Sequence, residues 1–139
     1  MTKVLDVESE PFSNHIIVLY DKACKLASKQ KYDQAMVYFD EILAIQKDHL
    51  DSLYGKGLTL CYMGKYEDAI SCFDRALEIN PRSTSSLCSK ANALYELGKY
   101  EKAISCYNKA LEINAKDSGA LIGKRVALDM IGKRSNMYN

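Results

Sequence analysis

Apolar residues in the middle of the chain recur at the spacing of one face of an α-helix. Leu53, Gly57 and Leu60 form such a face in one segment, and the same i, i+4, i+7 spacing runs from Ala69 to Ala76 in the next. Acidic and basic residues alternate at the remaining positions, as they do on a solvated helix face. The pattern therefore predicts two amphipathic helices joined by a short turn.

This helix pair returns at a fixed period. The second and third copies are identical at 17 of their 34 aligned positions, and a weaker copy precedes them. A repeated unit of this kind cannot bury its apolar face alone, so neighbouring copies must stack into an all-α solenoid. The predicted segments are a lead-in at 1–15, repeats at 16–49, 50–83 and 84–117, a capping helix at 118–134 and a tail at 135–139.

Glycine marks the turn between the two helices in two of the three repeats. Gly64 and Gly98 occupy the same repeat position, where a positive φ is favourable only for glycine. The first repeat has Gln30 at this position. We therefore expect its turn to be less tight, or strained.

The N-terminal segment shows no helical period over residues 1–12 and contains Pro11. Proline is disfavoured inside a helix, so we expect an extended lead-in. Ser13 or Asn14 then provides the N-cap of the first helix, because either side chain can accept a hydrogen bond from a free backbone amide.

The capping helix keeps two apolar residues that face a second helix in the other repeats. Leu121 and Leu128 occupy these positions, whereas Arg125 replaces the small residue of the other copies. We expect the leucines to be covered, either by the tail through Met137 and Tyr138 or by the same patch of a second chain in a homodimer.

Composition narrows the classes of function. The chain has 19 basic and 18 acidic residues, so it lacks the positive charge typical of proteins that bind nucleic acid or anionic membranes. Five cysteines without CxxC spacing, no export signal and no long apolar run favour a reduced, soluble, cytoplasmic protein without a cofactor.

Residues at fixed positions of each copy resemble the tetratricopeptide repeat. The second copy supplies Gly57, Leu60, Gly64, Tyr66, Ala69, Phe73, Ala76 and Pro81. The third copy lacks only the proline, and the first departs at Gln30, Ile42 and Lys47. The resemblance implies a right-handed superhelix of antiparallel helix pairs, whose concave face is formed mainly by the first helices. It implies binding of peptide segments on that face, and not catalysis.

The resemblance also assigns packing roles to small and aromatic residues. Gly57 is expected against Ala69, and the equivalent alanines of the third copy against each other, so that the helices approach closely. Phe73 and Tyr107 are expected to fill the space between neighbouring first helices.

The inward-facing positions of the first helices define a candidate peptide-binding groove. Its candidate residues are Tyr20, Cys24, Tyr54, Leu58, Tyr62, Cys88, Asn92, Tyr95, Ile122 and Val126. Tyrosines among apolar residues suit a binding hot spot, although the rings also suit simple coverage of neighbouring helices. Asn92, the only amide in this set, is the best candidate for a polar contact with a ligand backbone.

One subtype of the family clamps the carboxylate terminus of chaperones through Lys, Arg and Asn side chains. The corresponding positions here hold Tyr20, Cys24, Gly55, Ser85 and Ser89. None of these is a cation, so the sequence argues against a receptor of that kind.

Two other functions remain as alternatives. Thiolates bind soft metals, and Cys24, Cys61 and Cys88 fall on groove-facing positions. The spacing of first helices allows Cys61 and Cys88 to approach each other but places Cys24 too far away for the same zinc ion. Self-association is the second alternative. No pattern for catalysis was found, so we expect a non-enzymatic protein-interaction module.

Overall fold

The computed structural model describes residues 2–138, with side chains from residue 13 onward. Within this range the chain forms seven helices and no strand, which confirms the all-α solenoid. The helices are α1 (Thr2–Ser28), α2 (Tyr32–Ile45), α3 (Leu50–Tyr62), α4 (Tyr66–Ile79), α5 (Thr84–Glu96), α6 (Tyr100–Ile113) and α7 (Ser118–Met137). None of these helices is long and apolar enough to cross a lipid bilayer.

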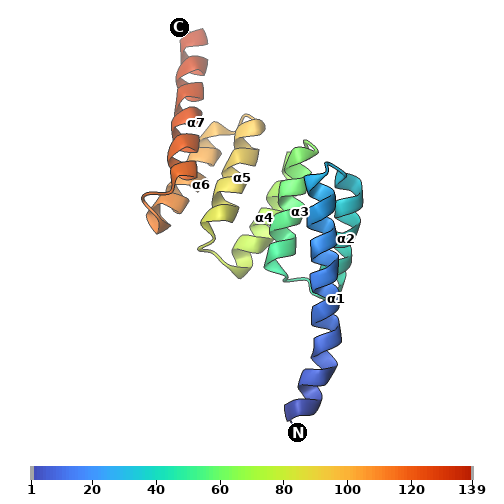
Figure 1. The fold of residues 1–139 in the computed structure, drawn as a ribbon. Helices are drawn as coiled ribbons and strands as arrows, with labels where there is room; N and C mark the ends of the chain where they lie inside the picture. Colours follow the sequence, from blue (N-terminus) through green and yellow to red (C-terminus); the bar gives the residue numbers. More distant parts are fainter. Residues whose placement is uncertain (1, 139) are drawn as a thin grey trace.

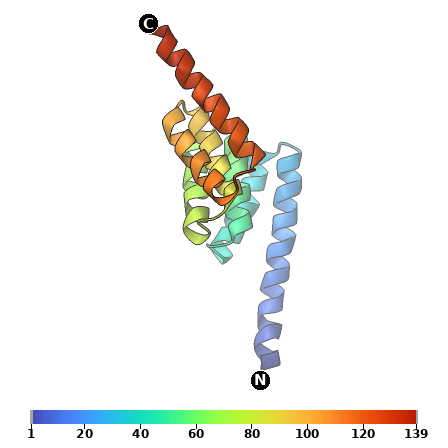
Figure 2. The same cartoon turned by 90° about the vertical axis from the view of Figure 1, so that its left-hand side faces the viewer.

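The helices stack in the order of the sequence (Figure 1). Successive helices pack as pairs, α1 with α2, α3 with α4 and α5 with α6, while α7 packs on the last pair. The first helices α1, α3, α5 and α7 also touch one another in sequence, and so form a continuous layer. Figure 2 shows the free ends of α1 and α7 projecting from the stack in opposite directions.

An aromatic side chain from each second helix fills the space between two first helices. Phe39, Phe73 and Tyr107 are at most 2% exposed. A Cβ atom added to Gly57 would lie 2.5 Å from Phe73 Cε1. The side chain that leaves no room for a Cβ at Gly57 is therefore the ring of Phe73, while the predicted approach of Gly57 to Ala69 stays a prediction. The predicted position between first helices is confirmed for Tyr107, which contacts Asn92 of α5 and leaves no room for a Cβ at Gly123 of α7.

Each inner first helix begins at a side-chain cap. His49, Ser83 and Asp117 accept hydrogen bonds from the backbone amide three residues further on, at 3.2, 3.2 and 2.9 Å. These caps satisfy amides that the helix itself leaves free. They fix the starts of α3, α5 and α7 at the same point of each repeat.

Ion pairs join the second helix of one repeat to the first helix of the next. Asp40 pairs with Lys56 at 2.7 Å, and Asp74 pairs with Lys90 at 2.6 Å. The third junction has Asn108 at the position of the aspartates, so its amide offers no negative charge. Because these pairs are partly exposed, each contributes at most about 1 kcal/mol to stability. Their main effect is to hold the side chains of Lys56 and Lys90 in place.

The turn of the first repeat is as tight as the other two. Gln30 has a φ of +63°, close to the +76° of Gly64 and Gly98. The closing hydrogen bond, from Lys31 N to Leu26 O, measures 2.9 Å, as do its equivalents. The expectation of a looser turn was wrong, whereas the expectation of strain is confirmed, because an L-residue at this φ brings Cβ close to the backbone.

The N-terminal end differs from the sequence prediction. Helix α1 begins at Thr2 and continues through Pro11, so the expected extended lead-in is absent from the described part of the chain and neither Ser13 nor Asn14 is a cap. A proline inside a helix removes one hydrogen bond and brings its ring close to the carbonyl four residues earlier, whereas each other residue that joins an existing helix adds a hydrogen bond. Side chains before residue 13 lie outside the described part.

The C-terminal end also differs. Helix α7 continues to Met137, and Arg134 pairs with Glu101 of α6 while lying 5.9 Å from the ring of Tyr100. These contacts favour the longer helix. Because the helix does not turn back, the predicted tail does not cover the two leucines of the capping helix.

We predict that Gln30→Gly stabilises the protein by about 1 kcal/mol, because glycine adopts the left-handed conformation without steric cost. The free energy of unfolding from urea titration measures the effect. Gly64→Gln is the reverse control, and should destabilise by a similar amount. A loss of stability in Gln30→Gly would contradict the strain.

We predict that Gly57→Leu destabilises by roughly 1–3 kcal/mol or more, because the new side chain overlaps the ring of Phe73. Arg125→Leu is the matched control at the same position of the capping helix, where no second helix crosses in the described structure. It should be nearly silent in thermal unfolding. Equal losses at both sites would contradict this account of the cap.

Candidate functional site

A pocket of about 410 Å³ lies between the first helices α1 and α3. It brings together five of the predicted groove residues. These are Tyr20, Cys24, Tyr54, Leu58 and Tyr62. None of the twelve residues that line this first-helix pocket carries a charge. A volume of this size is in the range of ligand-binding sites, and an uncharged lining suits apolar side chains.

The core holds two of the tyrosine rings in place. Tyr20 packs edge-on against Phe39 at a centroid distance of 6.2 Å, and burial, followed by a hydrogen bond with Cys24, raises the pKa of Tyr20 to about 12. Tyr54 lies 6.0 Å from Phe73, and its hydroxyl is 3.3 Å from Ser89 Oγ. Both rings therefore cover neighbouring helices and at the same time present a fixed surface to the pocket.

A stacked tyrosine pair at the edge of the pocket was not predicted. Tyr32 and Tyr62 lie 5.8 Å apart with nearly parallel rings, and Tyr62 is 72% exposed. Tyr32 belongs to the second helix α2, whereas the predicted groove residues all come from first helices. The signal available in the sequence is that a tyrosine follows the turn at the same position of each repeat, as Tyr66 and Tyr100 do.

The other predicted groove residues lie on α5 and α7 and do not line this pocket. Asn92 accepts a hydrogen bond from the hydroxyl of Tyr107, which leaves its amide hydrogens for another acceptor. Tyr95 packs on Tyr100 at 5.3 Å. On α7, Ile122 and Val126 are 64% and 40% exposed.

Acidic residues lie beside the first-helix pocket. An adjoining pocket of about 360 Å³ shares Tyr20 and Cys24 with it and also contains Asp21 and Asp51. Asp21 pairs with Lys25 at 2.9 Å, whereas Asp51 has no ion pair within the described residues. The combined surface is therefore apolar at one end and negative at the other.

The cysteines give no support to a metal or redox site. Burial, as the largest cause, raises the pKa of both Cys61 and Cys88 to about 11, so both thiols remain protonated at neutral pH. The thiol of Cys88 lies 3.8 Å from Oδ1 of Asp117 and can donate a weak hydrogen bond to it. Across residues 13–138, no three metal-ligating side chains come together.

The family follows from comparison with known sequences. A family model described as anaphase-promoting complex, cyclosome, subunit 3 matches residues 28–110. The chain belongs to this tetratricopeptide repeat family. The comparison with curated proteins gave no match.

Solved tetratricopeptide repeat domains share the fold at low sequence identity. The Sgt2 domain from Aspergillus fumigatus is 15% identical with a TM-score of 0.81, and the match covers 88% of this chain and 82% of that one. The first such domain of human RPAP3 is 21% identical with a TM-score of 0.81, covering 87% and 95%. The first domain of Spaghetti (RPAP3), bound to the HSP90 peptide SRMEEVD, is 20% identical with a TM-score of 0.79, covering 84% and 95%.

Proposed function

We propose that this protein is a non-enzymatic interaction module that binds a peptide segment of a partner protein across its first-helix layer. The observation that carries the proposal is the uncharged, tyrosine-lined pocket between α1 and α3. Tyrosine provides a large contact area at a small loss of side-chain entropy, and its hydroxyl still forms hydrogen bonds. The similar domain of Spaghetti (RPAP3) is bound to a peptide, which supports peptide binding by this fold.

The pocket chemistry defines the segment that fits. An apolar or aromatic side chain enters the first-helix pocket and packs on Tyr54, Leu58 and Tyr62. A basic residue of the segment reaches Asp51 in the adjoining pocket. Further along the layer, the amide of Asn92, whose oxygen is held by Tyr107, donates to a backbone carbonyl of the segment.

The proposed segment differs from the acidic HSP90 peptide SRMEEVD bound to the similar domain of Spaghetti (RPAP3). The positions that form the carboxylate clamp in that subtype hold Tyr20, Cys24, Gly55, Ser85 and Ser89 here. The negative charge of Asp51, which has no ion pair within the described residues, repels a carboxylate beside the pocket, so a partner rich in apolar and basic residues fits better.

We predict that Tyr54→Ala and Leu58→Ala each weaken binding by on the order of 1–3 kcal/mol while the helical content is unchanged. The ligand is a peptide selected from a random display library against the purified chain, and its affinity is measured by calorimetry. Val37→Ala, which shortens an exposed side chain on α2, is the control and should bind normally. Normal affinity in the Tyr54→Ala/Leu58→Ala double variant would place binding elsewhere.

A second candidate function is self-association through α7. Leu121 and Leu128 are each 49% exposed, whereas the equivalent Leu53 and Leu60 are 0% and 5% exposed. Covering a leucine side chain is worth up to about 1.5–3 kcal/mol, so two chains gain by pairing this face about a two-fold axis.

We predict that the native chain sediments and scatters light as a dimer at concentrations on the order of tens of micromolar, within the usual range of weak homodimers. Leu121→Glu/Leu128→Glu should be monomeric, because the charges prevent burial of the face. Val37→Glu, an exposed change on a different helix, is the control. A monomeric native chain would rule out the dimer.

A further inference from the structure

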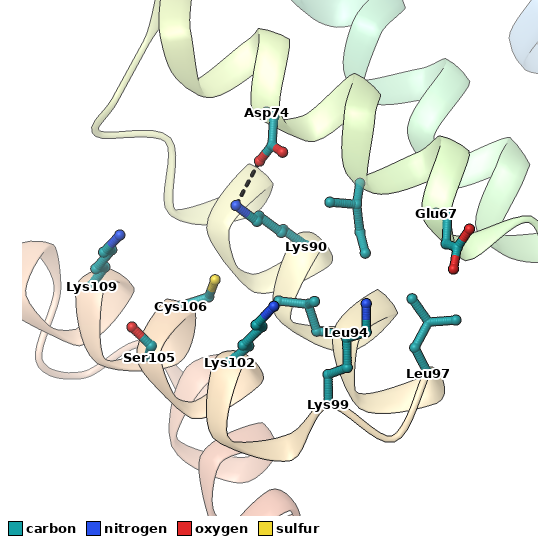
Figure 3. A pocket seen from close by; sticks show the side chains of 11 residues that line it. Glu67, Asp74, Lys90, Leu94, Leu97, Lys99, Lys102, Ser105, Cys106 and Lys109 are labelled. Carbon is teal, nitrogen blue, oxygen red and sulfur yellow. Dashed lines mark ion pairs between the residues drawn. The ribbon is translucent and has the colours of Figure 1, made fainter.

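A second groove lies on the opposite layer, between the second helices α4 and α6 (Figure 3). It has a volume of about 450 Å³, and residues of α5 and of the turn after it form its floor. The apolar part of its lining comes from Leu94 and Leu97 on this floor, with Ile70 of α4 and the buried Cys106 of α6 beside them. Burial raises the pKa of this thiol, so the floor is neutral. We call this the second-helix groove.

One wall of the groove carries uncompensated positive charge. Lys99, Lys102 and Lys109 line it from α6 and from the residue before α6, and none forms an ion pair within the described residues. The fourth lysine, Lys90, is neutralised by Asp74 across the groove, as the dashed line in Figure 3 shows. Three like charges on one wall attract an anionic ligand, and their field is concentrated by the apolar floor.

The preceding pair of repeats contains the same groove with a different charge. Its wall on α4 has Lys65, Asp68 and Arg75 at the positions of Lys99, Lys102 and Lys109. Asp68 reverses one charge, and Arg75 donates to the backbone oxygen of Lys47 at 2.8 Å. Although the two grooves share the same lysine–aspartate ion pair on the opposite side, only the later one has a fully basic wall.

We propose that the second-helix groove binds an acidic protein segment with an apolar anchor. Lys102 and Lys109 lie two helical turns apart, about 10 Å along the axis. In an extended segment, side chains on one face are two or four residues apart, about 7 or 13 Å, and the flexible lysine side chains bridge the difference, so both carboxylates can be paired at once. An apolar side chain between them meets the floor.

The acidic residues of the α4 wall favour a peptide over a nucleic acid or an anionic lipid surface as the ligand. Glu67 and Asp74 line α4, facing the lysines across the floor. A nucleic acid or an anionic lipid surface brings charge to both walls and is repelled by Glu67, the carboxylate of this wall that Lys90 does not neutralise. A peptide places its carboxylates on the α6 side only, and therefore fits the asymmetry.

The test is a binding titration on the full chain. The probe is a fluorescein-labelled peptide in which two leucines alternate with pairs of glutamates, followed by fluorescence anisotropy at low ionic strength. Lys102→Asp, which copies the charge of the earlier groove, should weaken binding by about tenfold or more, as expected for a close charge pair. Circular dichroism checks that the exposed substitution leaves the fold unchanged.

A matched gain-of-function variant can be made in the earlier groove. Asp68→Lys should create a second basic wall and raise the stoichiometry towards two peptides per chain. Tyr54→Ala, in the first-helix pocket, should bind this probe normally, which separates this site from the proposed function. Replacing the leucines of the probe by serines should also weaken binding. Equal affinity for Lys102→Asp, or tighter binding of a charge-matched oligonucleotide, overturns the proposal.

Discussion

The wedging of one aromatic ring between two first helices is the contact on which the rest of the structure depends. Phe39, Phe73 and Tyr107 come from second helices but are buried against their neighbours in the first-helix layer. Each ring sets the distance and angle at which the next first helix follows. The position of every groove side chain therefore depends on contacts made behind it, within the core.

The fold could be predicted from the sequence because the repeat period indicates which residues pack together. In the inner repeats, α3 and α5 begin at the first residues of the predicted repeats, Leu50 and Thr84. The ends could not be predicted in this way, since a helix there is decided by single contacts. The ion pair of Arg134 extends α7, and local hydrogen bonding carries α1 through Pro11.

The candidate site was predicted only in part. The pattern identified the first-helix face, which supplies Tyr20, Tyr54 and Leu58 to one pocket. It missed Tyr32, because a residue that follows a turn reaches the pocket edge only through the stacking geometry of α2 and α3. The charges on the second helices were interpreted as a uniform solvated face. Which of these charged residues line the same groove depends on how the repeats pack, and not on the spacing of the residues along the sequence.

The cap of α3 and the wall of the pocket beside it are formed by the same side chain. His49 Nδ1 accepts a hydrogen bond from Ser52 N at 3.2 Å. The ring of His49 also packs edge-on against Tyr20 at 6.0 Å and lines the pocket that contains Asp51. A substitution at His49 therefore alters the start of α3 and the surface beside Tyr20 together, so helix capping and pocket shape are not independent at this repeat junction.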